Sequence, residues 1–352
     1  MSKQIFPALT GVRALAAYMV FLHHYNPINE TNFPILNKFV GQFHIGVSIF
    51  FVLSGFLIAY RYMDSKNFHF GRYMVNRVAR VYPIYFILTT ITFLGTWYYQ
   101  QQQSFDWALY GMNISFLRGF FDDLKFTGIA QGWSLTVEET FYFSAPLFFL
   151  LLRKSKYFLI ILPVAILTIG FGIVYFFGNS LSFGFFSTNN FLLEYTFLGR
   201  VFEFFIGISI VFVMKKSQQL SKSGWLTYGG IVAMTICIYL MSILDNDGAA
   251  SDKIPFYFVY LLFLPLLGIA PLLFGLIQEK TVVQSLFSNK VAVLLGKSSY
   301  AFYLVHMGIF KFKLDTMTDN LWVIFIVLNI LAIGIYLFLE KPLNRIIRAR
   351  FT

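Results

Sequence analysis

Long apolar runs alternate with short polar segments along the whole chain. Each run is long enough to cross a bilayer as an α-helix, which needs about 20 residues. The pattern predicts spans at about 8–27, 42–61, 83–100, 131–152, 157–177, 199–215, 225–244, 255–277, 291–310 and 321–339. We therefore expect an all-α polytopic membrane protein with about ten transmembrane helices, in which residues 1–352 form a single membrane-embedded domain.

The composition agrees with this prediction and narrows it. Hydrophobic residues make up 58% of the chain and charged residues 12%, an apolar fraction well above that of soluble proteins. Cys237, the one cysteine, lies in an apolar run, which excludes a disulfide framework and a cysteine metal site. The first apolar run lacks a lysine-rich start and a cleavage site, so we expect it to be retained as a helix.

The positive charge of the chain is distributed unevenly. The formal net charge of +11 could suggest a nucleic-acid partner. Most lysines and arginines, however, fall on one side of the membrane when the N-terminus is placed inside. The excess of positive charge is therefore a topology signal. It predicts that both termini are cytoplasmic and gives no reason to expect a nucleic-acid partner.

The first apolar run carries charged and titratable residues, which are costly inside a bilayer and often mark a functional site. Arg13 and His24 are eleven residues apart, within roughly 20° of one helical face and about 16 Å along the axis. His23 points about 100° away and is the weaker candidate base. An arginine extending to one interface and histidines at the other would be the ordinary explanation, and this run alone leaves both open.

Two further runs contain polar stripes at helical spacing. Ser134, Glu138 and Tyr142 lie at i, i+4 and i+8 in the fourth span, and Glu139 points about 100° away from them. Glu138 could orient a histidine, or it could form an interhelical ion pair with Arg13 or Arg200.

The ninth span repeats this arrangement with Ser299, Tyr303 and His306 at i, i+4 and i+7. His306 could be a packing residue or part of a site. No HExxH motif, cysteine pair or carboxylate cluster accompanies it, so we predict no metal site.

The segment before the third span is basic. Arg77 and Arg80 share a helical face, Arg72 precedes them, and Pro83 is expected to begin the span. Guanidinium groups pair with phosphate bidentately, so three of them suit a nucleotide diphosphate. The positive-inside rule or binding of anionic lipid would explain them equally well. In the second span, Ser54 and Gly55 allow close helix packing, or Ser54 lines a cavity.

Taken together, these residues resemble the membrane-bound acyltransferase-3 family, whose members O-acylate surface sugars. The resemblance rests on Arg13 with His24, FFVLSGFLI (residues 50–58), Arg77 and Arg80 followed by Val-Tyr-Pro, Trp133-Ser134-Leu135, Val137-Glu138-Glu139, Phe141-Tyr142, Ser299-Tyr300, Tyr303, His306 and Glu340-Lys341-Pro342. These pieces occur in the right order over nearly the whole chain. Many relatives carry an additional extracytoplasmic domain, and we expect this chain to be of the stand-alone type.

The resemblance implies a reaction. Cytoplasmic acyl-coenzyme A, with acetyl as the default acyl group, would be the donor. The acceptor would be a hydroxyl of a surface glycan or of its lipid-linked precursor, at the bacterial cytoplasmic membrane. His24 would be the base, with Arg13, Glu138 and Glu139 as further catalytic candidates.

The resemblance also implies a donor site and leaves alternatives open. The donor-binding candidates are Arg72, Arg77, Arg80, Tyr82, Ser54, Tyr300, Tyr303 and His306. The outer loops at Phe120–Gly132, Gly178–Leu198 and Asp245–Pro255 could bind the acceptor. Intramembrane Arg, His and Glu would equally suit a proton-coupled transporter or a flippase of a glycolipid or small anion. A sensor or assembly factor without chemistry is a third possibility.

Overall fold

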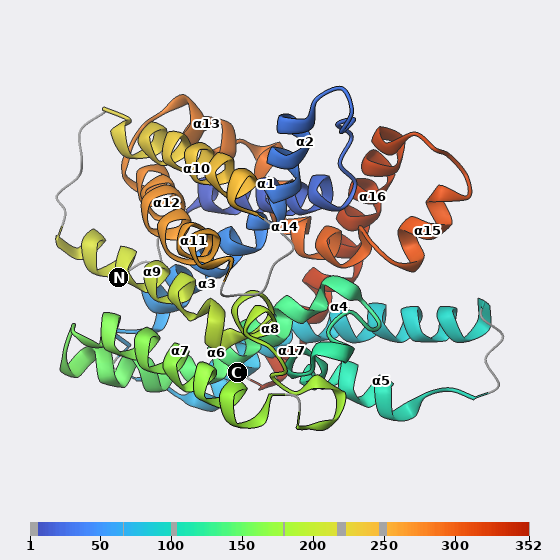
Figure 1. Ribbon diagram of the computed structural model, residues 1–352, viewed down its shortest axis with the longest axis horizontal. Coiled ribbons are helices and arrows are strands. Elements are labelled where there is room, and N and C mark those ends of the chain that lie inside the picture. The colour runs from blue at the N-terminus through green and yellow to red at the C-terminus, as the bar shows by residue number, and fades with distance from the viewer. Residues whose placement is uncertain are drawn as a thin grey trace. The chain divides into compact units, whose positions relative to one another are not determined.

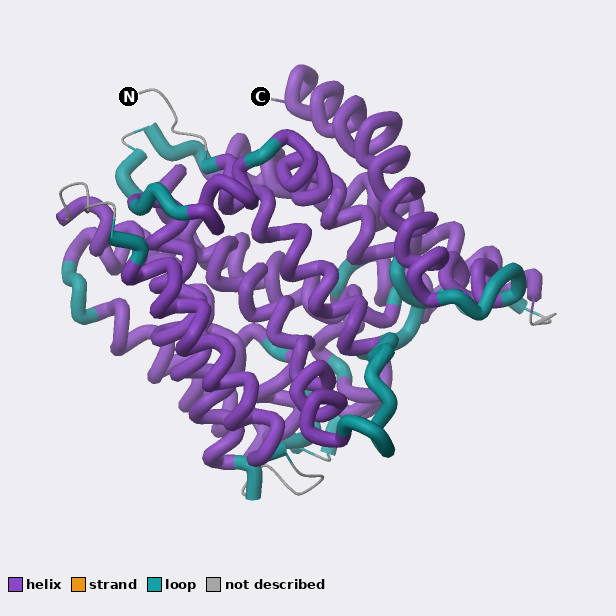
Figure 2. The backbone as a smooth tube through the Cα atoms, turned by 90° about the horizontal axis from the view of Figure 1, so that it is seen from above, coloured by secondary structure: helices purple, strands orange, loops and turns teal. Residues whose placement is uncertain are grey.

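The computed structural model describes residues 6–65, 67–99, 104–178, 180–216, 223–245 and 252–351. Helices joined by short loops make up this part of the chain, with one isolated β-bridge and no strand among the described residues (Figures 1 and 2). Residues 246–251 of the predicted outer loop Asp245–Pro255 lie outside the described residues.

Eight helices among the described residues are long and apolar enough to cross a membrane. They are Pro34–Tyr62, Phe70–Tyr99, Ala130–Lys154, Phe158–Phe177, Asn189–Lys215, Trp225–Leu244, Ile254–Gln278 and Leu321–Phe351. The fold is therefore that of an all-α polytopic membrane protein. Of the other two predicted spans, the first corresponds to one helix, Pro7–His24, and the second is divided between two helices. The cytoplasmic location of both termini stays a prediction.

The chain divides into two compact units, each built from two separate stretches. Unit 1 comprises Met1–Asp64 and Val201–Ser299, and unit 2 comprises Ser65–Arg200 and Tyr300–Thr352. Two of the three boundaries fall inside helices, α9 (Phe197–Lys216) and α14 (Lys290–Val305).

Unit 1 contains the first helices of the chain and most of its third quarter. Its other helices are α1 (Pro7–His24), α2 (Pro34–Gly41), α3 (Gly46–Tyr62), α10 (Trp225–Leu244), α11 (Ile254–Phe258), α12 (Ala270–Gln278) and α13 (Val282–Ser288). A 3-10 turn, Gln42–Ile45, precedes α3, and a π-helical segment, Val259–Ile269, joins α11 to α12.

Glycines bring the helices of unit 1 into backbone contact. A Cβ added at Gly55 of α3 would lie 2.1 Å from the carbonyl oxygen of Phe204 in α9, and one added at Gly207 would lie 2.1 Å from that of Val52. A Cβ at Gly296 of α14 would lie 1.8 Å from the carbonyl oxygen of Thr10 in α1. Small residues allow this close approach of membrane helices, so the predicted packing role of Gly55 is confirmed.

Unit 2 contains the remaining helices. They are α4 (Phe70–Tyr99), α5 (Trp107–Ile114), α6 (Trp133–Lys154), α7 (Phe158–Phe177), α8 (Asn189–Tyr195), α15 (Ile309–Asp315), α16 (Leu321–Ile335) and α17 (Lys341–Phe351). A π-helical segment, Tyr336–Glu340, joins α16 to α17.

The prediction that Pro83 begins the third span is wrong, because α4 runs through it from Phe70 to Tyr99. Proline lacks the N–H that would bond to the carbonyl four residues earlier. In α4 that carbonyl belongs to Ala79, and it accepts a hydrogen bond from Asn344 Nδ2 at 3.0 Å. A side chain from α17 thus satisfies the carbonyl that the proline frees, and the helix continues.

The prediction of one helix over residues 291–310 is also wrong. Helix α14 ends at Val305, and α15 begins at Ile309. Between them Gly308 has a φ of 72°, which favours glycine and interrupts the helix. The break leaves His306 just after the last helical residue, where the free carbonyls of the helix end need donors.

Candidate functional site

Histidine rings gather at the C-terminal end of α1. His23 Nδ1 hydrogen-bonds to the carbonyl oxygen of Gly41, and its ring packs edge-on against His24 and His44 at centroid distances of 4.8 and 5.2 Å. His44 in turn packs against Tyr260 at 4.9 Å. No pattern in the sequence pointed to His44, which lies 20 residues after His24, where a polar segment meets an apolar run.

The two histidines of α1 differ in environment. His23 is half-buried and tied to the backbone of Gly41, whereas the His24 side chain is exposed. An exposed imidazole can meet a hydroxyl that arrives from solution, and a ring held by a backbone carbonyl is less free to do so. These environments leave the His24 ring more accessible than the His23 ring, and the assignment of His24 as the base stays a prediction.

Arg13 lies on the same uninterrupted helix as His24. Its guanidinium carbon is 5.8 Å from the centroid of the Phe50 ring, and its buried Nε atom hydrogen-bonds to none of the described residues. Since the straight helix separates Arg13 from His24 by about 16 Å, the two side chains do not meet at one atom. Ser54 is half-buried on α3.

The predicted polar stripe on α6 is confirmed in part by side-chain contacts. Tyr142 donates a hydrogen bond from its hydroxyl to Glu138 Oε1, and Ser134 hydrogen-bonds to the Tyr303 hydroxyl at 2.9 Å. The guanidinium of Arg77 lies 5.7 Å from the centroid of the Tyr142 ring. Arg77 also interacts electrostatically with Glu139, so the carboxylates of α6 face cations of α4.

The three arginines of α4 differ strongly in exposure. Arg77 is 5% exposed, Arg80 is half-buried and Arg72 is exposed. Arg80 interacts electrostatically with Glu340, at the start of α17. Tyr82 is half-buried and stacks on Phe86 at a centroid distance of 5.9 Å. Arg77 and Arg80 therefore interact with carboxylates, whereas Arg72 is exposed to solvent.

The end of α14 is fixed by a residue that the sequence reasoning missed. Gln131, which is 3% exposed, donates from Nε2 to the carbonyl oxygens of Tyr303 and Leu304 at 2.7 and 3.0 Å. The Tyr303 hydroxyl donates to the Gln131 carbonyl oxygen at 3.1 Å. The available signal was its position, since Gln131 is a polar residue directly before the Gly-Trp-Ser-Leu segment.

His306 and Tyr300 are also held by backbone carbonyls. His306 is fully buried, and its Nδ1 lies 2.8 Å from the carbonyl oxygen of Tyr303, which makes Nδ1 the protonated nitrogen. Tyr300 donates from its hydroxyl to the carbonyl oxygen of Val81 at 2.8 Å. The Tyr300 contact thus positions α14 against α4, whereas the His306 contact is made within the end of α14. Ser299, in contrast, bonds within its own helix, to the Gly296 carbonyl at 2.9 Å.

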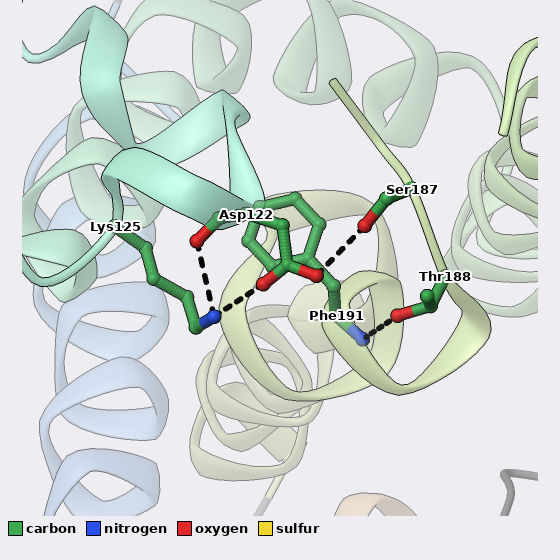
Figure 3. Close-up of polar contacts among 5 residues, drawn as sticks. All are labelled: Asp122, Lys125, Ser187, Thr188 and Phe191. Atoms are coloured by element: carbon green, nitrogen blue, oxygen red, sulfur yellow. Dashed lines mark hydrogen bonds and ion pairs between the residues drawn. The ribbon is translucent and has the colours of Figure 1, made fainter. Parts of the chain in front are cut away.

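Two of the predicted outer loops contact each other within unit 2. Figure 3 shows Asp122 between Lys125 and Ser187, and Ser187 Oγ donates to Asp122 Oδ2 at 2.7 Å. Lys125 forms an ion pair with Asp122 and lies 5.6 Å from the centroid of the Phe191 ring. Thr188 caps the start of α8 by accepting from the Phe191 N–H at 3.1 Å. These contacts give the two loops one defined arrangement.

Arg118 supports the first of these loops from inside. It is 0% exposed and donates to the carbonyl oxygens of Thr127 and Ile129. Burial lowers the pKa of its guanidinium, and the nearby Tyr85 opposes that shift. Arginine remains charged in proteins.

The predicted site residues therefore form two groups. Arg13, His24 and Ser54 belong to unit 1, whereas Arg72, Arg77, Arg80, Tyr82, Glu138, Glu139, Tyr300, Tyr303 and His306 belong to unit 2. The pairing of His24 with Glu138 joins residues of different units and stays a prediction. Among the described residues, no group of three or more His, Cys, Asp or Glu side chains could hold a metal ion.

Comparisons with known proteins bear on this arrangement. The chain is 23% identical to a Staphylococcus aureus (strain COL) protein provisionally named an O-acetyltransferase, over 96% of this chain and 57% of that protein. It is 24% identical to the peptidoglycan O-acetyltransferase OatA of Listeria monocytogenes, over 91% of this chain and 52% of the relative. The chain thus spans a little over half the length of these curated relatives. No solved structure matches it.

The family comparison covers more of the chain than any single motif. A family model described as an acyltransferase domain matches residues 6–340. That range includes α1 with Arg13 and His24, the arginines of α4 and the polar stripe of α6. The predicted resemblance is confirmed, and the chain belongs to the acyltransferase-3 family.

Proposed function

We propose that this protein is an O-acyltransferase of the bacterial cytoplasmic membrane. It transfers an acyl group, acetyl by default, from cytoplasmic acyl-coenzyme A to a hydroxyl of a surface glycan or its lipid-linked precursor. The match of residues 6–340 to the acyltransferase-3 family carries this proposal. O-acetyltransferases among its relatives, one of them named for peptidoglycan, support the acyl group and the type of acceptor.

The donor binds through its phosphates to the basic start of α4. Arg72 is open to solvent there, and Arg80 is half-buried one helical turn or more further in. Guanidinium groups match phosphate oxygens bidentately. Arg77 is buried against Tyr142 and near Glu139, so it orders the inner end of the donor site. Tyr82, Tyr300, Tyr303, His306 and Ser54 are the further donor-binding candidates.

His24 acts as the general base. Its imidazole takes the proton from the acceptor hydroxyl while the hydroxyl oxygen attacks the thioester carbonyl. The new carbon–oxygen bond forms, the carbon–sulfur bond breaks, and the coenzyme A thiolate leaves and takes up a proton. An unperturbed histidine titrates near neutral pH, which suits both directions of this proton transfer.

Arg13 serves the donor rather than the attacking hydroxyl in this proposal. It lies about 16 Å along α1 from His24, and its buried Nε lacks a hydrogen-bond partner among the described residues. A carbonyl oxygen of the donor arm would complete that hydrogen bond. Orientation of the base by Glu138 or Glu139 stays a prediction, and Arg13, Ser54 or Tyr303 is proposed to stabilise the developing oxyanion.

The test is a transfer assay with purified protein, labelled acetyl-coenzyme A and candidate glycans. We expect labelled glycan to form, and we expect Arg80→Ala to weaken donor binding about tenfold, the equivalent of one charged hydrogen bond. Donor affinity that is unchanged in Arg77→Ala and in Arg80→Ala would show that the phosphate site is elsewhere. Vesicle uptake or lipid flipping without any acyl transfer would instead identify a transporter or flippase.

A further inference from the structure

The last helix of the chain presents cations on one face. Lys341, Arg345 and Arg348 of α17 lie at i, i+4 and i+7, within roughly 60° of one another around the helix axis. Arg350 lies about 140° from Arg345, on the other side. Neither α17 nor α4 contains an acidic residue, so this face is positively charged over its whole length.

Two side chains hold α17 against the basic start of α4. Asn344 donates to the Ala79 carbonyl oxygen that Pro83 leaves free, at 3.0 Å. One turn later, Arg348 Nη2 donates to the carbonyl oxygen of Asn76 at 3.4 Å. Rising numbers on α17 meet falling numbers on α4, so the helices are antiparallel and the end of α17 lies beside the start of α4.

Because α17 and α4 are antiparallel, their charged residues follow one another along a line. Glu340 and Arg80 are at its inner end, and Arg77 lies one turn further out on α4. The exposed Arg345 of α17 and the exposed Arg72 of α4 follow toward the outer end. Arg80 and Arg72 are eight residues apart, or about 12 Å along the helix, a length over which a nucleotide can place more than one phosphate.

The inner and outer cations differ in their compensation by acidic groups. Arg80 interacts with Glu340 and Arg77 with Glu139, so the inner pair already has carboxylate partners. Arg345 has no carboxylate on its own helix or on α4 to offset its charge. An added anion would therefore gain most at the outer end of the line, where positive charge is in excess.

We propose that Arg345 and Arg348 of α17, together with Arg72 of α4, form an outer phosphate subsite that binds the 3′-phosphate of coenzyme A. This inference rests on the proposed function. The inner arginines then hold the diphosphate side of the donor, and the thioester arm continues inward. The subsite determines affinity for 3′-phosphorylated donors and takes no part in the chemical step.

The experiment compares two ligands and three variants of the full chain in detergent or nanodiscs. Binding of coenzyme A and of dephospho-coenzyme A, which lacks the 3′-phosphate, is measured for the wild type and for Arg345→Ala, Arg348→Ala and Arg350→Ala. We expect Arg345→Ala and Arg348→Ala each to weaken coenzyme A binding about tenfold. Dephospho-coenzyme A binding should change less than twofold. Arg350→Ala removes the same charge from the opposite face and should leave both affinities unchanged.

Arg345 is the sharper test of binding, because its side chain is exposed and forms no hydrogen bond or ion pair with the described residues, whereas Arg348 donates a hydrogen bond to α4. Equal losses for both ligands, or equal losses in Arg350→Ala, would overturn the subsite. Unchanged coenzyme A affinity in Arg345→Ala with a loss in Arg80→Ala would overturn the subsite and leave the proposed function standing. Lost binding to phosphatidylglycerol vesicles with unchanged coenzyme A affinity would assign the face to lipid instead. A wild-type protein that binds no coenzyme A would overturn both proposals.

Discussion

The two units of the molecule hold their helices together in different ways. In unit 1, glycines on α3, α9 and α14 let backbones touch, as at Gly55 against Phe204 and at Gly296 against Thr10. In unit 2, side chains cross between elements and donate to backbone carbonyls, as Gln131, Tyr300 and Asn344 do. The contacts in unit 1 require that the glycines carry no side-chain atoms. The contacts in unit 2 require side chains that donate hydrogen bonds.

Prolines show why unit 2 needs these donors. Pro83 and Pro146 lie inside α4 and α6, where each frees the carbonyl four residues earlier. Asn344 donates to the freed carbonyl of Ala79, and the Tyr73 hydroxyl donates to that of Tyr142 at 2.8 Å. Inside a membrane no water is available to satisfy such groups. Side-chain donors therefore both permit the prolines and join the helices.

The largest effect is expected at the candidate base. His24 is exposed at the end of α1, so His24→Ala should lower the transfer rate about 10²–10⁴-fold, the usual contribution of a general base. The melting temperature should stay close to the wild-type value, because truncation of an exposed side chain usually changes stability by less than about 0.5 kcal/mol. The exposed His69 of unit 2 offers a matched control, and His69→Ala should leave both quantities unchanged. Full activity in His24→Ala would remove it from the mechanism.

The backbone contacts of unit 1 predict the next largest effect. Gly55→Ala places a Cβ 2.1 Å from the carbonyl oxygen of Phe204, so the helices must separate, and we expect a loss of about 3 kcal/mol in unfolding free energy. Gly172→Ala on α7, where nothing lies within 4 Å of the added Cβ, should be neutral or slightly stabilising. Equal melting temperatures of the two variants would contradict the close packing of α3 and α9.

A smaller loss is expected from a donor of unit 2. Gln131→Met keeps the volume of the side chain but removes both hydrogen bonds to the end of α14. The Tyr303 carbonyl keeps its hydrogen bond from His306, but the Leu304 carbonyl loses its donor, which should cost about 2 kcal/mol and would be detected by thermal unfolding in detergent. Gln131→Glu restores an acceptor without the donor, so it should not recover stability. Wild-type stability of Gln131→Met would mean that the contact at the helix end is dispensable.

The smallest effect should come from a single hydroxyl. Tyr300→Phe removes one hydrogen bond to the Val81 carbonyl and should cost about 1 kcal/mol. Tyr98, on α4, is 73% exposed, and Tyr98→Phe serves as the control with no expected change. A loss in both variants would show that the effect belongs to the phenol group in general and not to the contact with α4.

Much of the membrane architecture followed from the sequence. Eight of the predicted spans correspond to helices of sufficient length and hydropathy, because a bilayer demands long apolar runs whatever their neighbours are. The Ser134–Glu138–Tyr142 stripe was also predictable, since helical spacing alone decides which residues share a face. The mistaken boundaries at Pro83 and after Val305 have one cause. Whether a helix continues past a proline or stops at a glycine depends on donors from distant segments.

The sequence by itself determined that this chain crosses a membrane as helices, which residues share faces with Arg13 and His24, and which family it resembles. Only the tertiary structure decided that Gln131 holds the end of α14, that His44 joins the histidines of α1 and that α17 lies beside the arginines of α4. The physical reason is the range of the interactions. Hydropathy and helical period act within one segment, whereas a freed carbonyl accepts whichever donor folding brings to it.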